Sequence, residues 1–188
     1  MKTLLVLAAS EHQIPVIRAG KKLGARALTT DNRPDNPGHA LADEAFWVDT
    51  TDPDAVLALA RAQGIDGIIS ACTDVAVPTA AHVSEQLGLP GIPLESAFTC
   101  TDKLRFRRFL DQVGLPNPPW VEIEVGGTST REIEVGGTST SEIPIPGQAL
   151  QILAKGPAIL KPADSSGSKG IFVVRSEAEL VERLPETA

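Results

Sequence analysis

Apolar and polar positions along the first half of the chain follow two different periods. Residues 3–9 are a nearly continuous apolar run, which is typical of a strand buried on both faces of a parallel sheet. In residues 14–23 apolar side chains recur at roughly helical spacing after Ser10, a residue type that favours the start of a helix. Residues 25–30 then read as a second strand. The short helical crossover makes the two strands parallel neighbours.

Caps and helix breakers extend this pattern. Pro53 suits the first turn of a helix that Thr51 or Asp52 can cap, and Gly64 suits its end. The other elements predicted here are a short strand at 46–48, a strand at 65–70, a helix at 76–87 ended by Gly88, and a strand or extended turn at 89–93. This order predicts an α/β fold with a doubly wound, Rossmann-like parallel sheet for residues 1–97.

The second half shows helical and strand-like patterns separated by proline and glycine. A helix over 104–113 is predicted to begin at Asp102-Lys103 and to end at Gly114, with an apolar stripe formed by Phe106, Phe109, Leu110 and Val113. Three arginines of this helix lie largely off the stripe, which is typical of a solvated face: Arg105, Arg107 and Arg108. Two short apolar runs, 159–160 and 171–174, flank a Ser/Gly/Lys loop and predict a hairpin, and another helix begins near Ser176.

Residues 122–141 contain a tandem repeat, in which Glu-Ile-Glu-Val-Gly-Gly-Thr-Ser-Thr occurs twice. Two copies are too few for a solenoid. Each copy resembles half a hairpin with a Gly-Gly turn. With two-residue turns Glu122 faces Arg131, but the apolar face flips along the meander, so the register is weakly specified. We interpret the repeat as a surface β insertion formed by duplication, natural or engineered, without a catalytic role.

The composition is that of a globular protein with an acidic balance. Hydrophobic residues make up 42% of the 188 residues, and the formal net charge is −7. This charge argues against nucleic acid or an anionic membrane as the main partner, because both require clustered Lys and Arg. Cys72 and Cys100 fit neither a disulfide framework nor a metal motif, and the histidines lack metal-ligand spacing. We therefore expect reduced thiols, no metal site and a cytoplasmic location.

The apolar run near the start has a second interpretation, as the core of a signal peptide. Only one basic residue precedes residues 4–10, and the run is at the short limit for such a core. A buried first strand is therefore the better interpretation. No run approaches the roughly 18 apolar residues of a membrane span.

Polar side chains follow the predicted parallel strands at their carboxyl ends, where ligands bind in sheets of this kind. The candidate substrate residues are Ser10 and Glu11 after the first strand, Asp31 after the second, and Thr73 and Asp74 after the strand at 65–70. Loops are polar in any case, so a structural role for each residue stays open. The first turn lacks Gly-x-Gly-x-x-Gly, which argues against a nicotinamide-dependent dehydrogenase.

The Ser/Gly/Lys loop of the predicted hairpin is a candidate anion site. Lys161 ends the first strand and Lys169 lies in the loop, whose glycines let the backbone approach a ligand. The P-loop spacing is absent, and a strand rather than a helix follows. A phosphate cover and an ordinary exposed hairpin are both open on this stretch alone.

Several segments together resemble the ATP-grasp ligases of the carbamoyl-phosphate-synthase-like kind. The residues that carry the resemblance are Thr30 to Gly38 with Ala42-Asp43, Gly64 to Ile69, Ala71 to Thr79, Gly88 to Gly91, Asp102-Lys103, Gly114 to Pro118, and Lys161-Pro162 with Ser165 to Gly170. Each segment is short, but their order and spacing are specific and cover most of the chain outside 122–147. The resemblance implies a pre-ATP-grasp domain at 1–97 and the first, incomplete α+β ATP-grasp subdomain at 98–188.

The resemblance also implies a chemistry, the ATP-dependent joining of a carboxylate to an amine through an acyl phosphate. It implies that Lys103 and Lys161 contact ATP phosphates and that a loop closes over them, formed by Ser165, Ser166, Gly167, Ser168, Lys169 and Gly170. ATP and a small carboxylate are the expected ligands, with magnesium as the metal. A homodimer stays open, and the sequence does not indicate which carboxylate or amine is used.

The chain ends before the second lobe and the magnesium ligands that the resemblance implies. One wall cannot bury most of a ligand, so we expect the chain alone to bind ATP weakly at best and to lack ligase activity. Two alternatives stay open. One is a non-enzymatic small-ligand-binding or regulatory module that uses the strand ends near Asp31 and Asp74, and the other is an engineered fragment.

Overall fold

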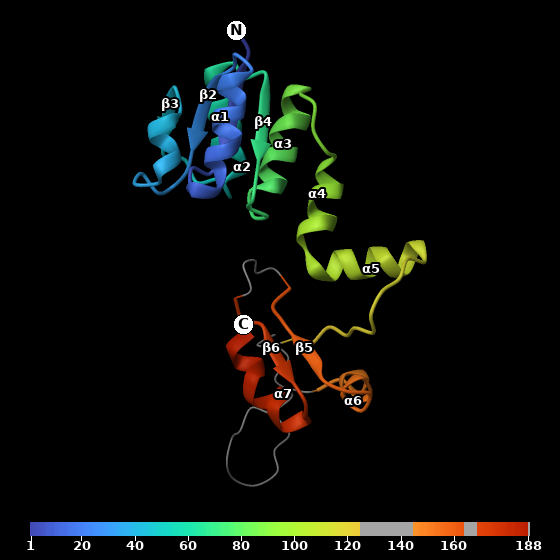
Figure 1. Ribbon diagram of the computed structural model, residues 1–188. Coiled ribbons are helices and arrows are strands. Elements are labelled where there is room, and N and C mark those ends of the chain that lie inside the picture. Colours follow the sequence, from blue (N-terminus) through green and yellow to red (C-terminus); the bar gives the residue numbers. More distant parts are fainter. Residues whose placement is uncertain (125–144, 164–168, 188) are drawn as a thin grey trace, which may run out of the picture. The chain divides into compact units, whose positions relative to one another are not determined.

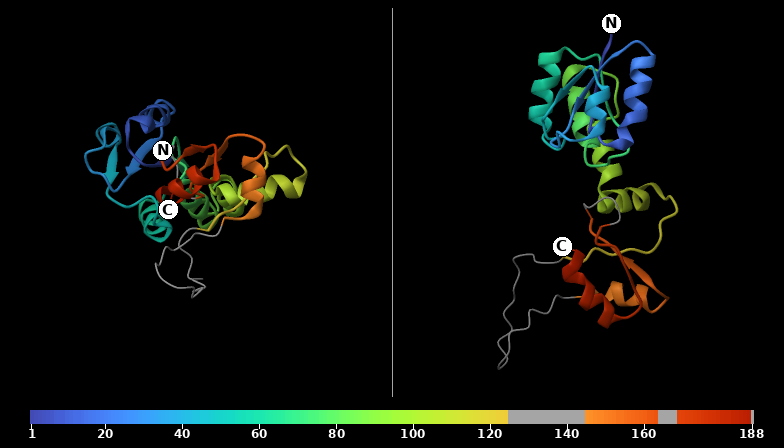
Figure 2. Two further views of the ribbon diagram at one scale, coloured as in Figure 1. Left: turned by 90° about the horizontal axis from the view of Figure 1, so that it is seen from below. Right: turned by 60° about the vertical axis from the view of Figure 1, so that its left-hand side comes forward.

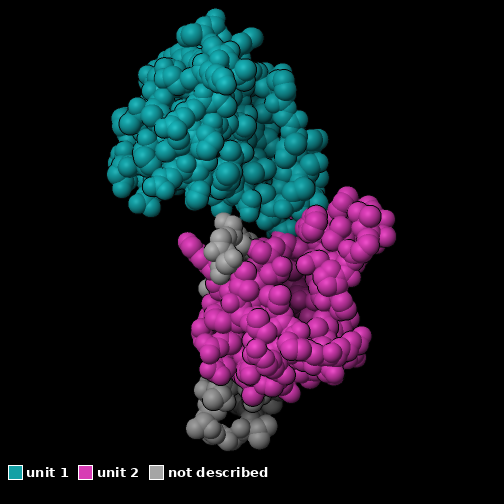
Figure 3. All heavy atoms as spheres, viewed as in Figure 1, with its two compact units in different colours: residues 1–102 teal, residues 103–188 magenta. Residues whose placement is uncertain are grey.

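The computed structural model describes residues 1–124, 145–163 and 169–187. The chain forms two compact units, Met1–Asp102 (unit 1) and Lys103–Ala188 (unit 2), which Figure 3 distinguishes by colour. Most of the repeat at 122–141 and the loop residues 164–168 lie outside the described residues.

Unit 1 is built on a four-stranded parallel sheet with the strand order β3-β2-β1-β4. The strands are β1 (Thr3–Leu7), β2 (Arg26–Thr30), β3 (Glu44–Phe46) and β4 (Gly67–Ser70). β1 pairs with β2 on one side, with Leu5 opposite Leu28, and with β4 on the other, with Leu5 opposite Ile68. The sequence therefore correctly predicted the α/β class and the parallel neighbours.

Helices cover both faces of this sheet, as Figure 2 shows for α1 (Ile14–Lys22) and α2 (Pro53–Gln63). Leu5 and Leu7 of β1 share a core cluster with residues of α2 and α3 (Val77–Leu87). Val6, between them, packs with residues of α1 in a different cluster. Alternate side chains of a strand point to opposite faces, so the apolar run of β1 contributes side chains to a core on each face of the sheet. This arrangement confirms the doubly wound sheet.

Local signals set the ends of the helices. The Asp52 carboxylate accepts a hydrogen bond from the Ala55 N–H at the start of α2. Gly64 and Gly88 follow α2 and α3 in the left-handed conformation, with φ of +57° and +63°. Glycine adopts this conformation without the steric cost of a Cβ atom. Ser10 caps a short 3₁₀ helix, Glu11–Gln13, that leads into α1.

Three details of unit 1 differ from the sequence-based expectation. β3 is Glu44–Phe46, two residues before the strand predicted at 46–48, because Leu28 and Thr30 of β2 pair with Glu44 and Phe46. Residues 89–93 form no strand, which agrees with the second of the two alternatives predicted there, an extended turn. The sequence also missed α4 (Leu94–Thr101), which begins after Pro93 without a side-chain cap. A further 3₁₀ helix, Pro37–Leu41, lies in the loop after β2.

Unit 2 holds α5 (Lys103–Val113), α6 (Gly147–Leu153), the hairpin of β5 (Ala158–Leu160) and β6 (Phe172–Val174), α7 (Glu177–Arg183) and a 3₁₀ helix, Leu184–Thr187. The two strands are antiparallel, with Ile159 opposite Val173, as the sequence predicted. Ser176 caps α7 by accepting from the Glu179 N–H. The unit has its own small core, centred on Ala149, Val174, Leu180 and Leu184.

Among the described residues, no helix is long and apolar enough to cross a membrane.

Candidate functional site

The rim at the carboxyl ends of β1 and β4 is the first candidate site. The chain passes from β1 to β2 and β3 on one side of the sheet, whereas β4 lies on the other side of β1. The switch point of the sheet is therefore between β1 and β4, where open α/β sheets bind ligands. Ser10 and Glu11 follow β1, and Thr73 and Asp74 follow β4. The pairing of Leu7 with Ser70 brings these two loops together.

A buried glutamine connects the two loops. Gln13 is 1% exposed. Its Oε1 accepts from the Ser10 hydroxyl at 2.6 Å, and its Nε2 donates to the Ala71 carbonyl at 2.5 Å. Buried polar groups that are fully paired hold one arrangement of the backbone. Gln13 thus holds the Ser10 side chain from the buried side, while Glu11 and Asp74 are exposed on the rim.

Both loops begin with an unusual backbone conformation. Ala8 has φ of +69° and Cys72 has φ of +57°, in the left-handed region that non-glycine residues rarely adopt. Such conformations persist where the surrounding structure holds them. The sequence carried no glycine signal at either position, so this feature could not be predicted.

Asp31, the candidate after β2, lies beneath the neighbouring loop. It is 8% exposed. One carboxylate oxygen accepts from the Ala9 N–H at 2.9 Å and from Asn36 Nδ2 at 2.7 Å, and the other accepts from the Arg33 N–H at 3.0 Å. With its oxygens already paired, Asp31 holds the loops after β1 and β2, which indicates a structural role.

Unit 2 contains the second candidate site, a cavity of about 870 Å³. Lys103 and Arg107 of α5 and Lys161 after β5 line it together. The Lys103 N–H donates to the Ala163 carbonyl at 3.2 Å, and its Nζ donates to the same oxygen at 3.3 Å. These bonds hold the start of α5 against the chain just after Lys161. The two lysines named by the resemblance thus lie in one cavity.

The electrostatics of Lys161 reflect this crowding of cations. Its pKa is lowered, first by desolvation of the ammonium group and then by the positive charges of Arg107 and Lys103. A phosphate group that binds between these cations would offset their mutual repulsion. Apolar side chains such as Trp120, Ile123 and Leu153 also line the cavity, together with Glu122, Glu124 and Lys155. Cations combined with apolar side chains suit a nucleotide, and the volume falls within the range of about 300–1,000 Å³ typical of ligand pockets.

Arg107 lines the cavity, whereas its place off the apolar stripe predicted a solvated helix face. It lies one helical turn after Lys103, and residues four apart share a face of a helix. That spacing was the available signal. The apolar positions of α5 gave no indication of the cavity, and no residue of α5 is buried.

The predicted phosphate-covering loop is only partly within the described residues. Ser165, Ser166, Gly167 and Ser168 lie outside them. Lys169 is exposed, and Gly170 has φ of +65°, where an added Cβ would meet the Pro162 ring at 3.0 Å. Gly170 is therefore required for the close return of the hairpin.

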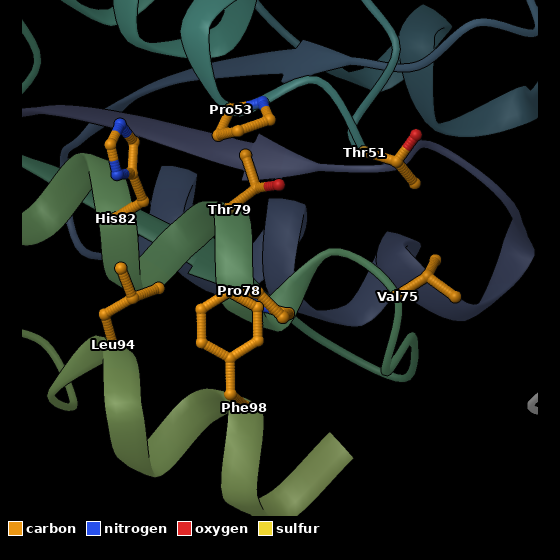
Figure 4. Close-up of a pocket in the computed structure, with 8 residues that line it drawn as sticks. All are labelled: Thr51, Pro53, Val75, Pro78, Thr79, His82, Leu94 and Phe98. Atoms are coloured by element: carbon orange, nitrogen blue, oxygen red, sulfur yellow. The ribbon is translucent and has the colours of Figure 1, made fainter. Parts of the chain in front are cut away.

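A smaller pocket lies between α3 and α4, with a volume of about 180 Å³ (Figure 4). It is lined by Thr51, Pro53, Val75, Pro78, Thr79, His82, Leu94 and Phe98. This volume is below that of typical ligand sites. We assign it no binding role.

No metal site is found in the part of the chain that the structure describes. No group of three or more His, Cys, Asp or Glu side chains there could hold an ion. We therefore assign no magnesium ligands among the described residues.

Residues 17–91 match the family model described as the ATP-grasp N-terminal domain. A formate-dependent phosphoribosylglycinamide formyltransferase from Burkholderia pseudomallei is 29% identical over 180 residues, 94% of this chain and 40% of that relative. The match extends past the ATP-grasp N-terminal domain into unit 2, and this chain spans about 40% of the length of the curated relatives it matches.

Solved structures share the fold of the ATP-grasp N-terminal domain and of the residues that follow it. N5-carboxyaminoimidazole synthetase from Staphylococcus aureus, solved with ADP, gives a TM-score of 0.73 at 17% identity, covering 100% of this chain and 46% of that one. Phosphoribosylglycinamide synthetase from Anaerococcus prevotii gives 0.64 at 22% identity, covering 99% and 42%. The resemblance to ATP-grasp ligases seen in the sequence is thereby confirmed.

Proposed function

We propose that this chain supplies the phosphate-binding side of an ATP-dependent carboxylate–amine ligase. The observation that carries the proposal is the meeting of Lys103 and Lys161 in one cavity, where the Ala163 carbonyl holds Lys103. Lysine ammonium groups bind phosphate oxygens as point charges. Lys169, Gly170 and the loop residues Ser165 to Ser168 are proposed to cover the phosphates.

The chain's own residues would act by binding and positioning. Phosphoryl transfer depends mainly on placing the reactants in line and on neutralising charge, so no side chain here needs to form a covalent bond. When bound, ATP supplies the phosphoryl group. In the overall reaction the carboxylate oxygen attacks the terminal phosphorus and ADP leaves. The amine then attacks the acyl carbon, phosphate leaves and the amine loses a proton.

The small substrates are proposed to bind at the rim of β1 and β4. Ser10 and Glu11 follow β1 and Thr73 and Asp74 follow β4, and the exposed carboxylates of Glu11 and Asp74 suit an amine or hydroxyl groups. The B. pseudomallei relative is named for formate and phosphoribosylglycinamide. We therefore propose a small carboxylate such as formate and a phosphorylated amine as the first substrates to test. Magnesium as the metal, a cytoplasmic location and a homodimer stay predictions.

The test is to measure ATP binding by the full chain with calorimetry. We expect a dissociation constant on the order of 1 mM, and no measurable binding in the double variant Lys103→Met/Lys161→Met. Lys22→Met in unit 1 is the matched control and should bind as the wild type does. If the double variant binds ATP normally, the phosphate role fails and a small-ligand-binding module based on the unit 1 rim becomes the better interpretation.

A further inference from the structure

We infer that Arg107 is a third phosphate-binding cation of the unit 2 cavity and that Asn117 positions its guanidinium group. This inference rests on the proposed nucleotide function of the cavity. It adds a residue that the resemblance to ATP-grasp ligases did not name, and a mechanism that orients it.

The first support is the placement of Arg107 on α5. Lys103 and Arg107 are four residues apart and therefore project from the same face of the helix. Both line the cavity, whereas Arg105 and Arg108 do not. Arg108 instead forms an ion pair with Glu122 at 2.5 Å. The three arginines of α5 thus have different surroundings, and only Arg107 shares the cavity with the two lysines.

The second support is the anchoring of the guanidinium. Arg107 Nη1 donates to Asn117 Oδ1 at 2.8 Å, and Asn117 Nδ2 donates back to the Arg107 carbonyl at 3.0 Å. The same amide nitrogen donates to Asp111 Oδ1 at 2.8 Å. Asp111 also accepts from the Trp120 indole at 2.8 Å. The extended segment after α5 is therefore fastened to the helix, and Asn117 has a fixed place beside Arg107.

The third support is the chemistry of the anchor. A guanidinium has five N–H donors in a planar fork, and the bond to Asn117 is made through one terminal nitrogen. The remaining donors can bind a phosphate in the two-pronged manner that suits arginine. Asn117 is neutral, so it orients the group without neutralising its charge. A carboxylate at this position would compete with the phosphate.

The fourth support is electrostatic. Arg107 contributes to the lowered pKa of Lys161, after desolvation and ahead of Lys103. Its positive charge therefore acts directly on the group that ends β5. The acidic groups nearby are Glu122 and Glu124, which line the cavity, and Asp111, which is held by Asn117 and Trp120. Glu122 is already paired with Arg108.

The experiment uses the full chain with Trp47→Phe, which leaves Trp120 as its single indole. Trp120 fluorescence is followed on titration with ADP and, separately, with adenosine, which lacks phosphates. Arg107→Gln is expected to weaken ADP binding about tenfold or more and to leave adenosine binding unchanged, since one charge-assisted contact is lost. Arg105→Gln removes the same charge from the exposed side of α5 and is the control, with an expected change below about twofold.

The outcomes separate this inference from the proposed function. If Lys103→Met and Lys161→Met weaken ADP binding but Arg107→Gln does not, the role of Arg107 is overturned and the phosphate site stands. If ADP fails to bind the parent protein, or none of the three variants changes its affinity, both are overturned. An equal loss for ADP and adenosine in Arg107→Gln also overturns the role of Arg107, because the effect would not depend on phosphate.

A second measurement tests the geometry without a ligand. The rate at which an amine-specific acylating reagent modifies Lys161 is read by mass spectrometry at pH 9. Arg107→Gln should slow this reaction, because loss of the nearby charge raises the pKa of Lys161 and leaves less neutral amine. An unchanged rate shows that Arg107 does not face Lys161 and overturns the inference.

Asn117 is tested in the same assay. Asn117→Ala should slow the acylation, because the freed guanidinium moves away from Lys161. Asn117→Ser keeps a hydroxyl that can accept from Arg107 and should react at nearly the parent rate. The positioning role is overturned if the alanine variant is as fast as the parent or if the serine variant is as slow as the alanine variant.

Discussion

The two units of this chain build their candidate sites on very different foundations. In unit 1 the strands are buried between two helical layers, and Leu5, Val6 and Leu7 are all 0% exposed. In unit 2 the hairpin has one open apolar face, with Ile159 66% and Val173 52% exposed, and α5 contributes no buried residue. Hydrogen bonds of the buried Gln13 and Asp31 hold the loops of the unit 1 rim. In unit 2, bonds of the part-buried Lys103 and Asn117 hold the α5 side of the cavity.

This difference has a consequence for the binding chemistry. The unit 1 rim has loops held by buried groups, so its exposed side chains start from a fixed backbone. The unit 2 cavity depends on side chains such as Lys103 and Asn117 that hold its walls themselves. Substitutions at the unit 2 site should therefore change binding and local structure together more often than substitutions at the rim.

The largest expected effect tests whether the two cores are separate. Leu5→Ala should lower the free energy of unfolding of unit 1 by about 3–5 kcal/mol, because it leaves a cavity in a closely packed core. Leu184→Ala is the counterpart in unit 2, where the side chain is 1% exposed, and should cost about 2–3 kcal/mol because the surroundings can relax. Urea unfolding is followed through Trp47 in a Trp120→Phe background and through Trp120 in a Trp47→Phe background.

Each leucine variant should shift only the transition of its own unit. If Leu5→Ala shifts the Trp120 transition as far as the Trp47 transition, the units unfold as one and the comparison fails.

A smaller effect concerns Asp31. Asp31→Ala leaves three donors without their acceptor and should destabilise unit 1 by about 2–3 kcal/mol. ADP binding by unit 2 should not change. Asp35→Ala is the control, since its ion pair with Arg33 is long, at 3.7 Å, and exposed. Denaturant midpoints measure the stability of both variants. If Asp31→Ala is as stable as Asp35→Ala, the structural role is wrong and Asp31 is again a candidate substrate residue.

The smallest effect is a difference in acid sensitivity. Hydrogen bonds lower the pKa of three carboxyl groups of unit 1. Asp43 accepts from Lys21 and the Ala27 N–H, and Asp49 accepts from the Thr51 N–H and hydroxyl. Asp66 accepts from Lys2 and the Thr3 N–H. Each stabilises unit 1 above the ordinary carboxyl pKa of 3.8, and the stabilisation is lost as the pH falls through the lowered value. In unit 2 the pKa of Asp111 is lowered by hydrogen bonds from the Asn117 amide and the Trp120 indole.

Unit 1 should therefore lose more stability than unit 2 between about pH 5 and pH 2. Urea midpoints at each pH give the two slopes, and Asp43→Asn should flatten that of unit 1. A steeper slope for unit 2 would contradict this assignment.

Elements with local signals could be predicted from the sequence. Asp52 with Pro53 and Gly64 marked both ends of α2, and the alternation of turn residues with branched residues marked the hairpin. The helix α4 was missed because it starts after Pro93 with no Ser, Thr, Asp or Asn cap. The position of β3 was missed because pairing with β2, not local propensity, sets its ends.

The candidate sites were predictable only in part. Strand ends pointed to Ser10 and Asp74, and the resemblance named Lys103 and Lys161. The roles of Gln13 and Asn117 could not be predicted, because each side-chain amide joins segments that only the folded structure brings together. Gln13 meets Ala71 through the parallel pairing of β1 with β4, which no local pattern encodes.

Gln13 also separates two tasks that are joined in many sites. The loops after β1 and β4 are joined by the buried side chain of Gln13, while Glu11 and Asp74 face solvent. Natural variation can therefore exchange residues such as Glu11 and Asp74 without rebuilding the loops. With the substrates at the rim as proposed, single substitutions there would change substrate preference while the architecture is inherited unchanged.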